Sequence, residues 1–346
     1  MKQHRLAIIG FGGMGNWHRE TIEGIDGLSV KGIFDIKKER QEFAKELGIY
    51  VYQDLEEALA DDEIDILLCA TPNDVHKDVV IKALQAGKYV VCEKPAACNS
   101  EDFLAMMNAQ NTSCLFVHQN RRWDEDYLTV RKIVDDQLLG PVFALESRVH
   151  GSRGIPGDWR GTKESGGGMV LDWGVHILDQ ALQMIDSKLV KVHADLTHVT
   201  NELVDDGFTA HLYFENGVIF TAEVRTSSFV TLPRWYVMGR DGTAVIHDFD
   251  LSGEMVRVTD WNKNDAIPIK TAAGLTKTMA PRTKDTIVSE KLPLQHSDIR
   301  EYYQNVMAVM DGQAEQIVKN EEVLRVLKLM EAIFESAEKQ QVVEFE

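Results

Sequence analysis

The sequence predicts two domains. Residues 1–122 are expected to form a doubly wound α/β domain with a parallel sheet, and residues 123–346 an α+β domain with an open, mainly antiparallel sheet and helices on one face. Up to residue 122 the chain alternates strand and helix patterns with short connections, whereas strand patterns then follow one another with few helices between them. A chain of 346 residues is also long for a single core.

The first domain is recognised by short apolar runs, which are typical of parallel strands covered on both faces. We predict strands at residues 6–9, 28–34, 65–70, 89–92 and 115–118. We predict helices from residue 16 onward and at residues 37–47, 75–86 and 100–109. Gly48 and Gly87 end two of these helices, and Asn99 caps the last one.

The second domain begins with a helix at residues 126–139 that ends at Gly140. Strands are then predicted at residues 142–150, 189–199, 209–214, 218–226, 235–238 and 243–246. The dipeptide Asn216-Gly217 stands between two alternating runs and is a strong signal for a hairpin, so these strands are expected to pair antiparallel. Two late helices, at 299–310 and 321–338, close the chain and can pack back on the first domain.

Composition excludes several classes of function. The formal net charge of −18 repels nucleic acids and anionic lipid surfaces. No window approaches the roughly 18 unbroken apolar residues of a membrane helix, and the N-terminus lacks the apolar stretch of a signal peptide. The four cysteines form no CxxC pair, which favours reduced, buried thiols over a redox or metal site. We therefore expect a cytoplasmic protein that binds neither nucleic acid nor membrane.

A glycine-rich turn follows the first strand and precedes the first helix. Its sequence, Gly10-Phe11-Gly12-Gly13-Met14-Gly15, is GxGxxG. Gly10 permits the tight turn, Gly12 lets the backbone approach a pyrophosphate, and Gly15 lets the helix pack on the strand. A plain tight turn would explain the glycines alone. The position after a strand, and an acid about 20 residues further on, favour dinucleotide binding.

That acid is Asp35, at the end of the second strand and followed by Ile36. A carboxylate there accepts hydrogen bonds from ribose hydroxyls and repels a 2′-phosphate, so NAD is predicted over NADP. Lys37 and Lys38 offset this repulsion in an alternative interpretation, although they also suit a solvated helix start.

Two further segments stand at the carboxyl ends of predicted parallel strands, where open α/β sheets bind ligands. One segment contains Ala70, Thr71, Pro72, Asn73 and His76, and the other contains Glu93, Lys94 and Pro95. A lysine after a strand is ordinarily a surface charge. Lys94 differs because it lies between an acid and a proline that fixes the loop, so it becomes a candidate functional residue.

The segment from Gly166 to Asp179 carries the other candidate site. If it is helical, Asp172 and His176 stand at i and i+4 on one face, so that the carboxylate can orient the imidazole as a general base. The three glycines at 166–168 leave room for a ligand or cofactor to approach. The alternatives are a glycine-rich turn with a satisfied core histidine, and a metal site formed by Asp172, His176 and Asp179.

The motifs GFGGMG, ATPNDVH, EKP and GGGMVLDWGVHILD occur in the order seen in the Gfo/Idh/MocA family, named for glucose–fructose oxidoreductase and inositol dehydrogenase, and the chain resembles that family over essentially its whole length. The resemblance implies a Rossmann domain followed by an open sheet that also forms the subunit interface. A homodimer or homotetramer is therefore expected.

The resemblance also implies roles for individual residues. Lys94 is similar to a lysine that contacts the nicotinamide ribose and the substrate hydroxyl, and the Lys94-Pro95 bond is expected to be cis. Asp172 and His176 resemble the pair that lines the substrate pocket, with His176 as proton acceptor. The residues that resemble the cofactor-binding strip are Ala70, Thr71, Pro72, Asn73, His76 and Glu93. Trp159-Arg160 and Asn120 are expected at the cofactor and Arg122 at the substrate, although these four side chains equally suit packing or surface roles.

The predicted function is hydride transfer between NAD and a ring hydroxyl or ketone of an inositol or sugar-like polyol. His176, oriented by Asp172, would take the proton, and Lys94 would stabilise the alkoxide. Two alternatives remain: a glycoside- or sugar-modifying enzyme that recycles its NAD in place, and a non-catalytic NAD-binding regulator.

Overall fold

The computed structural model describes residues 2–109 and 114–345. Its first domain contains a six-stranded parallel sheet in the order β3-β2-β1-β4-β5-β6. The strands are β1 (His4–Ile9), β2 (Leu28–Phe34), β3 (Tyr50–Val51), β4 (Ile66–Cys69), β5 (Tyr89–Cys92) and β6 (Leu115–Val117). Because β1 lies at the centre, between β2 and β4, the turn that follows it opens at the point where the strand order reverses, which is where such sheets bind ligands.

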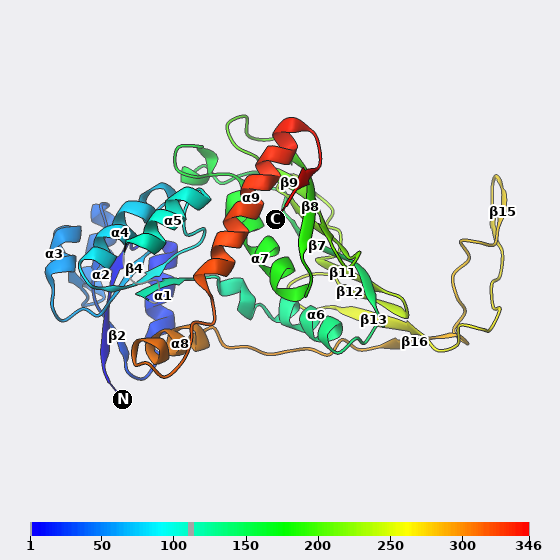
Figure 1. The fold of residues 1–346 in the computed structure, drawn as a ribbon, viewed down its shortest axis with the longest axis horizontal. Helices are drawn as coiled ribbons and strands as arrows, with labels where there is room; N and C mark the ends of the chain where they lie inside the picture. The colour runs from blue at the N-terminus through cyan, green and yellow to red at the C-terminus, as the bar shows by residue number, and fades with distance from the viewer. Residues whose placement is uncertain (1, 110–113, 346) are drawn as a thin grey trace.

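Five helices belong to this domain: α1 to α4 pack against strands of the parallel sheet, and α5 packs against α4 and α9 (Figure 1). They are α1 (Gly13–Ile22), α2 (Lys38–Glu46), α3 (Leu55–Ala60), α4 (His76–Gln85) and α5 (Ser100–Asn108). The predicted cap of the last of these is present, since the Asn99 side chain accepts a hydrogen bond from the backbone of Asp102. The doubly wound parallel sheet predicted from the sequence is therefore confirmed.

The second domain contains a nine-stranded sheet in the order β16-β13-β12-β11-β7-β10-β9-β8-β17. The strands are β7 (Val142–His150), β8 (Leu189–Thr197), β9 (Gly207–Phe214), β10 (Ile219–Arg225), β11 (Trp235–Gly239), β12 (Gly242–Ile246), β13 (Gly253–Val258), β16 (Ile287–Glu290) and β17 (Val343–Glu344). Neighbouring strands pair antiparallel except β7 and β10, which are parallel. The expected mainly antiparallel sheet is thus confirmed.

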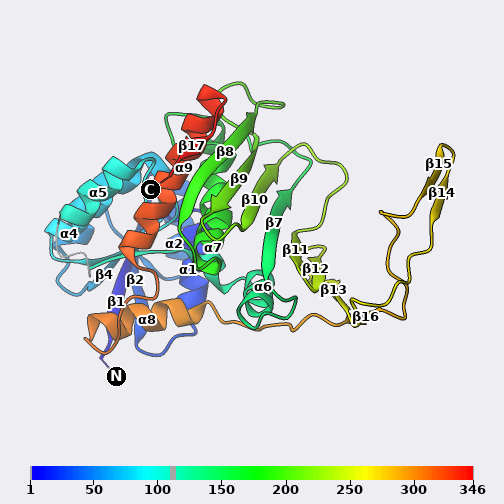
Figure 2. The same ribbon diagram turned by 45° about the vertical axis from the view of Figure 1, so that its right-hand side comes forward.

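One face of the nine-stranded sheet is covered by helices, as Figure 2 shows for α7 (Val175–Met184) and α9 (Asn320–Lys339). Side chains alternate accordingly: in β9, Phe208, Ala210 and Leu212 are buried, whereas His211 and Tyr213 on the opposite face are half-buried. The remaining helices of this domain are α6 (Glu125–Asp135) and α8 (Arg300–Met310). No helix in the described part of the chain covers the other face of the sheet.

The two late helices link the domains. The Glu331 carboxylate on α9 accepts hydrogen bonds from the backbone and hydroxyl of Ser100, at 2.7 and 2.8 Å. Helix α8 packs against α1, where the hydroxyl of Tyr303 bonds Nδ1 of His18 at 2.6 Å. Among the described helices, none combines the length and apolar content needed to span a membrane.

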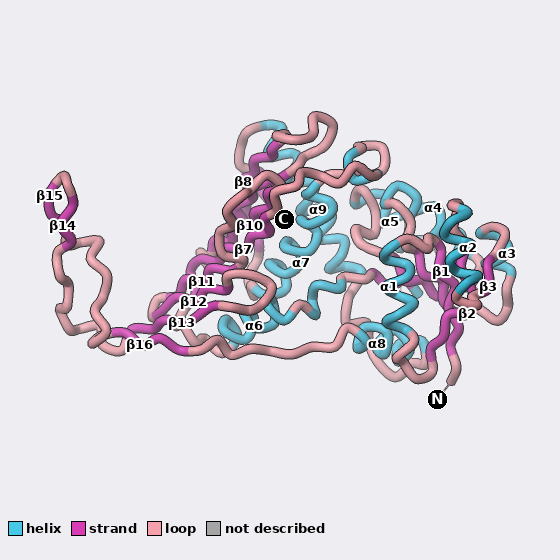
Figure 3. Tube along the Cα trace, turned by 180° about the vertical axis from the view of Figure 1, so that it is seen from behind, coloured by secondary structure: helices cyan, strands magenta, loops and turns pink. Residues whose placement is uncertain are grey.

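Several details differ from the sequence predictions. Helix α6 ends at Asp135 rather than near residue 139, because Gln137 adopts a left-handed conformation with a φ of 52° before Gly140. The short elements β3 and α3 were not predicted, and neither were the strands beyond residue 246. Between β13 and β16 the chain forms a long arm that carries the hairpin β14 (Ile269–Thr271) and β15 (Gly274–Thr276), visible in Figures 1 and 3.

Candidate active site

The glycine turn has the geometry of a phosphate cradle. Gly10 has a φ of +93°, and a Cβ there would lie 2.5 Å from the carbonyl oxygen of Ala70. A Cβ on Gly15 would press against the Gly10 carbonyl oxygen. At Gly12 and Gly13, by contrast, no described atom lies within 4 Å of an added Cβ. Space is therefore open at the N-terminus of α1, where backbone N–H groups favour anions, and these residues fit a dinucleotide.

Asp35 holds this turn in place. Its carboxylate accepts a hydrogen bond from the backbone of Phe11 at 2.7 Å and another from the backbone of Lys37 at 2.8 Å. Next to it, Ile36 is 84% exposed, and Met14 on the turn is also exposed. The acid thus fixes the turn at the same time as it lies where a cofactor ribose is expected.

Lys94 meets Asp172 from the other domain. The ammonium donates to the Asp172 carboxylate at 3.1 Å and to the Asp172 backbone oxygen at 2.9 Å. The bond between Lys94 and Pro95 is cis, as expected. Burial alone would raise the pKa of Asp172, but Lys94 and Arg160 hold that pKa below its ordinary value. Asp172 is therefore an ionised group that fixes the lysine.

The predicted pairing of Asp172 with His176 is wrong. Residues Val170–Gly174 form a π-helical turn and α7 begins only at Val175, so the segment is not one continuous α-helix. The carboxylate of Asp172 binds Lys94, and Nδ1 of His176 is buried without a hydrogen-bond partner among the residues described. Burial, followed by the charges of Lys94 and Arg121, lowers the pKa of His176 well below its ordinary value. This imidazole is neutral.

The expected room around the three glycines at 166–168 is taken by the protein itself. A Cβ at Gly166 would lie 2.5 Å from Sγ of Cys98, and the next two would press on the Arg160 carbonyl and on the Asp205 carboxylate. The Asp205 carboxylate accepts a hydrogen bond from the backbone of Val170 at 2.8 Å, and burial raises its pKa to about 7. These glycines serve close packing rather than ligand approach.

Arg122 was expected at the substrate, but it is buried in ion pairs. Its guanidinium binds both carboxylate oxygens of Asp179, at 2.6 and 2.8 Å, and Glu322 at 2.7 Å. Asp179 and Asp172 are thus held by different cations, so the alternative metal site with His176 is not assembled. The alternative interpretation of Arg122, that it closes the end of the sheet, is the one the geometry favours.

Arg160 does reach the site. Its Nε lies 3.5 Å from the Asp172 carboxylate, its Nη1 donates to Asp158 at 2.7 Å, and its guanidinium stacks on Trp159 with 4.5 Å to the ring centroid. Asn120 lies at the start of a short 3-10 helix (Asn120–Trp123) and has a buried Oδ1 for which the described residues supply no partner.

The strip after β4 is tied to its surroundings. Asn73 donates to the carbonyl of Gly166 at 2.8 Å and so bridges the two domains. The ring of His76 is fully buried between the carbonyl oxygens of Pro95 and Thr71, at 3.0 and 2.9 Å. His76 therefore joins the loops after β4 and β5 instead of presenting its ring to a cofactor, which corrects the sequence prediction.

Glu93 is also an interior group, contrary to the cofactor contact expected of it. One carboxylate oxygen accepts from Nε2 of His18 at 2.7 Å and from Nδ1 of His118 at 2.9 Å, and the other accepts from the backbone of Lys94 at 3.0 Å. Burial would raise the pKa of Glu93, but His118 and His18 hold that pKa well below its ordinary value. Tyr303 completes the network by binding His18.

Sequence reasoning missed this network because its two histidines stand 100 residues apart in the chain. Their donor atoms and the carboxylate lie within 4.8 Å of one another, a spacing that also suits a metal ion. The hydrogen bonds already account for the arrangement, since each imidazole donates to the same oxygen. The sequence signal that was available is the acid directly before Lys94.

A cation–aromatic cluster beside His176 was missed as well. The guanidinium of Arg121 lies 4.1 Å from the ring centroid of Trp173, and Trp173 contacts the rings of both His176 and Phe249. Arg121, rather than the neighbouring Arg122, is therefore the arginine next to the candidate base.

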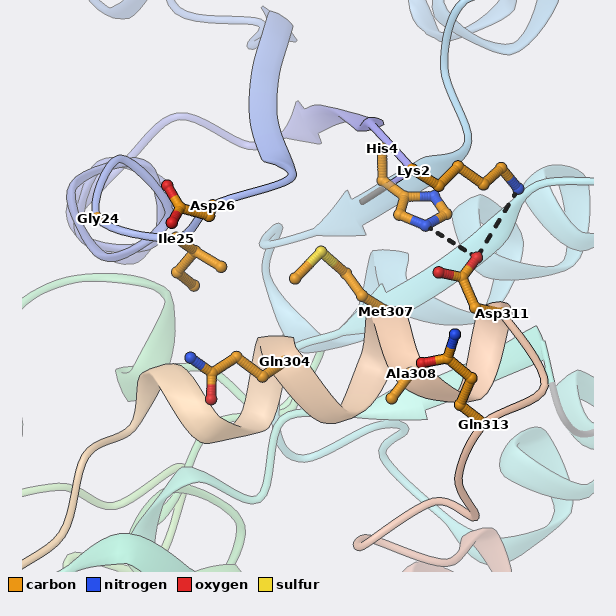
Figure 4. A pocket seen from close by; sticks show the side chains of 10 residues that line it. All are labelled: Lys2, His4, Gly24, Ile25, Asp26, Gln304, Met307, Ala308, Asp311 and Gln313. Atoms are coloured by element: carbon orange, nitrogen blue, oxygen red, sulfur yellow. Dashed lines mark ion pairs between the residues drawn. The ribbon is translucent and has the colours of Figure 1, made fainter.

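A separate pocket of about 420 Å³ is lined by residues of the first domain and of α8 (Figure 4). Its lining residues come from the start of β1, the turn before β2, α8 and the residues just after α8, and include His4, Ile25, Met307 and Asp311. It belongs to the junction of α8 with the first domain and not to the strand ends that carry Lys94.

Two stretches of the chain match protein families. Residues 4–119 match an oxidoreductase family with an NAD-binding Rossmann fold. Residues 127–245 match the GFO/IDH/MocA C-terminal domain.

Individual proteins are similar over much or all of the chain. The crystal structure of an NAD-binding protein from Listeria innocua is 49% identical, covers 100% of both chains and has a TM-score of 0.96. The scyllo-inositol 2-dehydrogenase (NADP(+)) of Bacillus subtilis is 25% identical over 99% of this chain and 96% of its own. The myo-inositol 2-dehydrogenase of Thermotoga maritima is 28% identical over 57% of this chain and 60% of its own.

Proposed function

The chain belongs to the Gfo/Idh/MocA oxidoreductase family, and from this premise we propose that it transfers hydride between NAD and a ring hydroxyl or ketone of an inositol or sugar-like polyol. The observation that carries the proposal is the junction of the two domains, where the Lys94 ammonium is fixed on Asp172. Burial, and then the charge of Lys94, lowers the pKa of the nearby His176. Similarity to two inositol dehydrogenases supports the substrate class.

Each group has one task in this proposal. NAD, when bound, supplies the hydride acceptor. His176 accepts the hydroxyl proton, because burial and the charges of Lys94 and Arg121 lower its pKa and so keep the imidazole unprotonated. Lys94 stabilises the alkoxide as the proton leaves. Asp172 is a positioning residue, since it holds Lys94 rather than His176.

We propose NAD rather than NADP as the cofactor. The proposal rests on Asp35, whose carboxylate is fixed by the backbone of Phe11 and Lys37 at the end of β2, because an acid at this point of the motif disfavours a 2′-phosphate. The similar enzyme from Bacillus subtilis is named for NADP(+), so this choice needs its own test. Tighter binding of NADP than of NAD in a fluorescence titration would overturn it.

We further propose a cytoplasmic protein that assembles as a homodimer or homotetramer through the open face of the nine-stranded sheet. That face carries half-buried side chains such as Tyr213 and Tyr236 and ion pairs such as Arg225–Glu223. A sheet face of this kind is suited to burial against a second copy.

The test is absorbance at 340 nm with NAD and then NADP across inositols, hexoses, pentoses and glycosides. We expect a net signal with one polyol class. Lys94→Ala and His176→Ala should then lower kcat by roughly 100-fold or more while NAD affinity stays near wild type. Lys82→Ala is the matched control, because this lysine is exposed on α4 and binds Glu56. Unchanged turnover in both site variants would reject the assignment.

A further inference from the structure

The arm between β13 and β16 is the part of the molecule that the proposed function does not use. Residues 259–286 leave the edge of the nine-stranded sheet, and their hairpin forms a separate two-stranded sheet from β14 and β15. Figures 1 and 3 show this hairpin far from both domains.

The base of the arm is fixed in its direction. The Asp265 carboxylate accepts hydrogen bonds from the backbone and hydroxyl of Thr283, at 2.7 and 2.9 Å, and binds Thr286 as well. The guanidinium of Arg282 stacks on Trp261 with 4.7 Å to the ring centroid, and Trp261 in turn donates to Asp241 at 3.0 Å. The arm therefore projects because its two limbs are tied together at the root.

The tip of the arm exposes apolar side chains. Ile267 is 70% exposed, Leu275 is 74% exposed and Met279 is 77% exposed. An isolated two-stranded hairpin is marginally stable in water and needs another surface to pack on. Three large apolar side chains exposed on one short segment make this segment a candidate interaction site.

The positive charge of the arm indicates that its binding partner has an acidic surface. The whole arm, residues 259–286, carries five cations and three acids, a formal charge of +2. Its outer part, residues 266–284, contains Lys270, Lys277, Arg282 and Lys284 and no Asp or Glu, a formal charge of +4. Since the whole chain carries −18, removal of +4 leaves −22 on the remaining residues. The outer part of the arm, residues 266–284, is thus basic and apolar, whereas the rest of the protein is acidic.

We propose that this arm docks on the body of a second copy of the chain. A second copy brings an acidic surface to every arm, and two-fold symmetry lets both arms be exchanged at once. A nucleic acid or an anionic membrane would suit the tip but would be repelled by the −22 of the body that stands behind it. Each limb of about 13 residues reaches up to roughly 40 Å when extended, which is enough to cross onto a neighbouring domain.

Hydrogen exchange measured by mass spectrometry tests this on the wild-type protein. At concentrations where sedimentation shows an oligomer, we expect amide protons of residues 269–276 to exchange at least tenfold more slowly than after dilution to monomer. Equal exchange in monomer and oligomer would overturn the proposal. Protection that appears only on addition of duplex DNA or phosphatidylserine vesicles would overturn it in favour of a polyanionic partner.

A charge-reversal pair supplies an independent test. Lys270→Glu with Lys277→Glu should weaken self-association at least tenfold in sedimentation velocity, with an unchanged melting temperature. Lys45→Glu with Lys328→Glu changes the net charge equally, at exposed positions on α2 and α9, and should leave association unchanged. Equal effects of the two pairs would reject the arm as the contact. Because both readouts are independent of turnover, they do not depend on the proposed chemistry.

Discussion

Replacing Asp172 with asparagine separates two accounts of this carboxylate. The sequence pattern predicts that Asp172 orients His176, whereas its carboxylate in fact binds the Lys94 ammonium at 3.1 Å. Asp172→Asn removes the charge and keeps the size of the side chain. We therefore expect Asp172→Asn to lower kcat/KM through its effect on Lys94 and not through an effect on His176.

The expected decrease in kcat/KM depends on the hydrogen bonds that Lys94 keeps in the variant. A hydrogen bond to a charged group contributes about 1.5–3 kcal/mol. The Asp172 backbone oxygen keeps its own bond to the ammonium at 2.9 Å, so the effect should lie at the lower end. About 1.5–2 kcal/mol corresponds to a ~10- to 30-fold decrease in kcat/KM.

The assay is a double-mutant cycle with initial rates at 340 nm on the polyol that the panel identifies. In a Lys94→Met background, Asp172→Asn should lower kcat/KM by no more than about 3-fold, because the partner is already gone. In a His176→Ala background, Asp172→Asn should still lower kcat/KM by the full ~10- to 30-fold. The reverse pattern, with coupling to His176 and none to Lys94, would refute the reasoning, and melting curves verify that each variant is folded.

Three further predictions concern the cradle and two buried acids. Gly12→Ala should leave the melting temperature unchanged and weaken NAD binding at least tenfold, because the added Cβ meets no protein atom but fills the cradle. Gly15→Ala should destabilise the fold by about 1–3 kcal/mol, because its Cβ meets the backbone oxygen of Gly10. Equal effects of the two variants on stability would contradict this. Glu93→Gln should lower the free energy of unfolding in urea by about 1–3 kcal/mol, with the exposed Glu56→Gln as control. Burial raises the pKa of Asp205 to about 7, so the wild type should lose stability relative to Asp205→Asn as pH rises from about 4 to about 7, since the charged form is disfavoured in the fold, and the difference should level off above that. A constant difference in melting temperature across this range would argue against it.

The fold was predictable because its signals are local. Apolar runs bounded by glycines mark parallel strands, and alternation around Asn216-Gly217 marks antiparallel ones. The arm was not predictable, because residues 259–286 show neither apolar runs nor strand alternation. Their shape depends instead on hydrogen bonds such as the one from the Thr283 backbone to the Asp265 carboxylate. The family was likewise evident from four motifs, while the roles proposed for the site residues stay predictions.

The sequence by itself determined the two-domain order, the glycine turn with its acid, and the presence of Lys94, Asp172 and His176 as candidate groups. Only the tertiary structure decided which of them touch. Lys94 and Asp172 stand 78 residues apart and meet because the loop that follows β5 lies against the π-helical turn Val170–Gly174. Likewise, Glu93 is buried because it forms hydrogen bonds with His18 and His118, which are distant in the sequence. Hydrogen bonds and charges act over a few ångströms in space, whereas sequence spacing reports only contacts within one helix or strand.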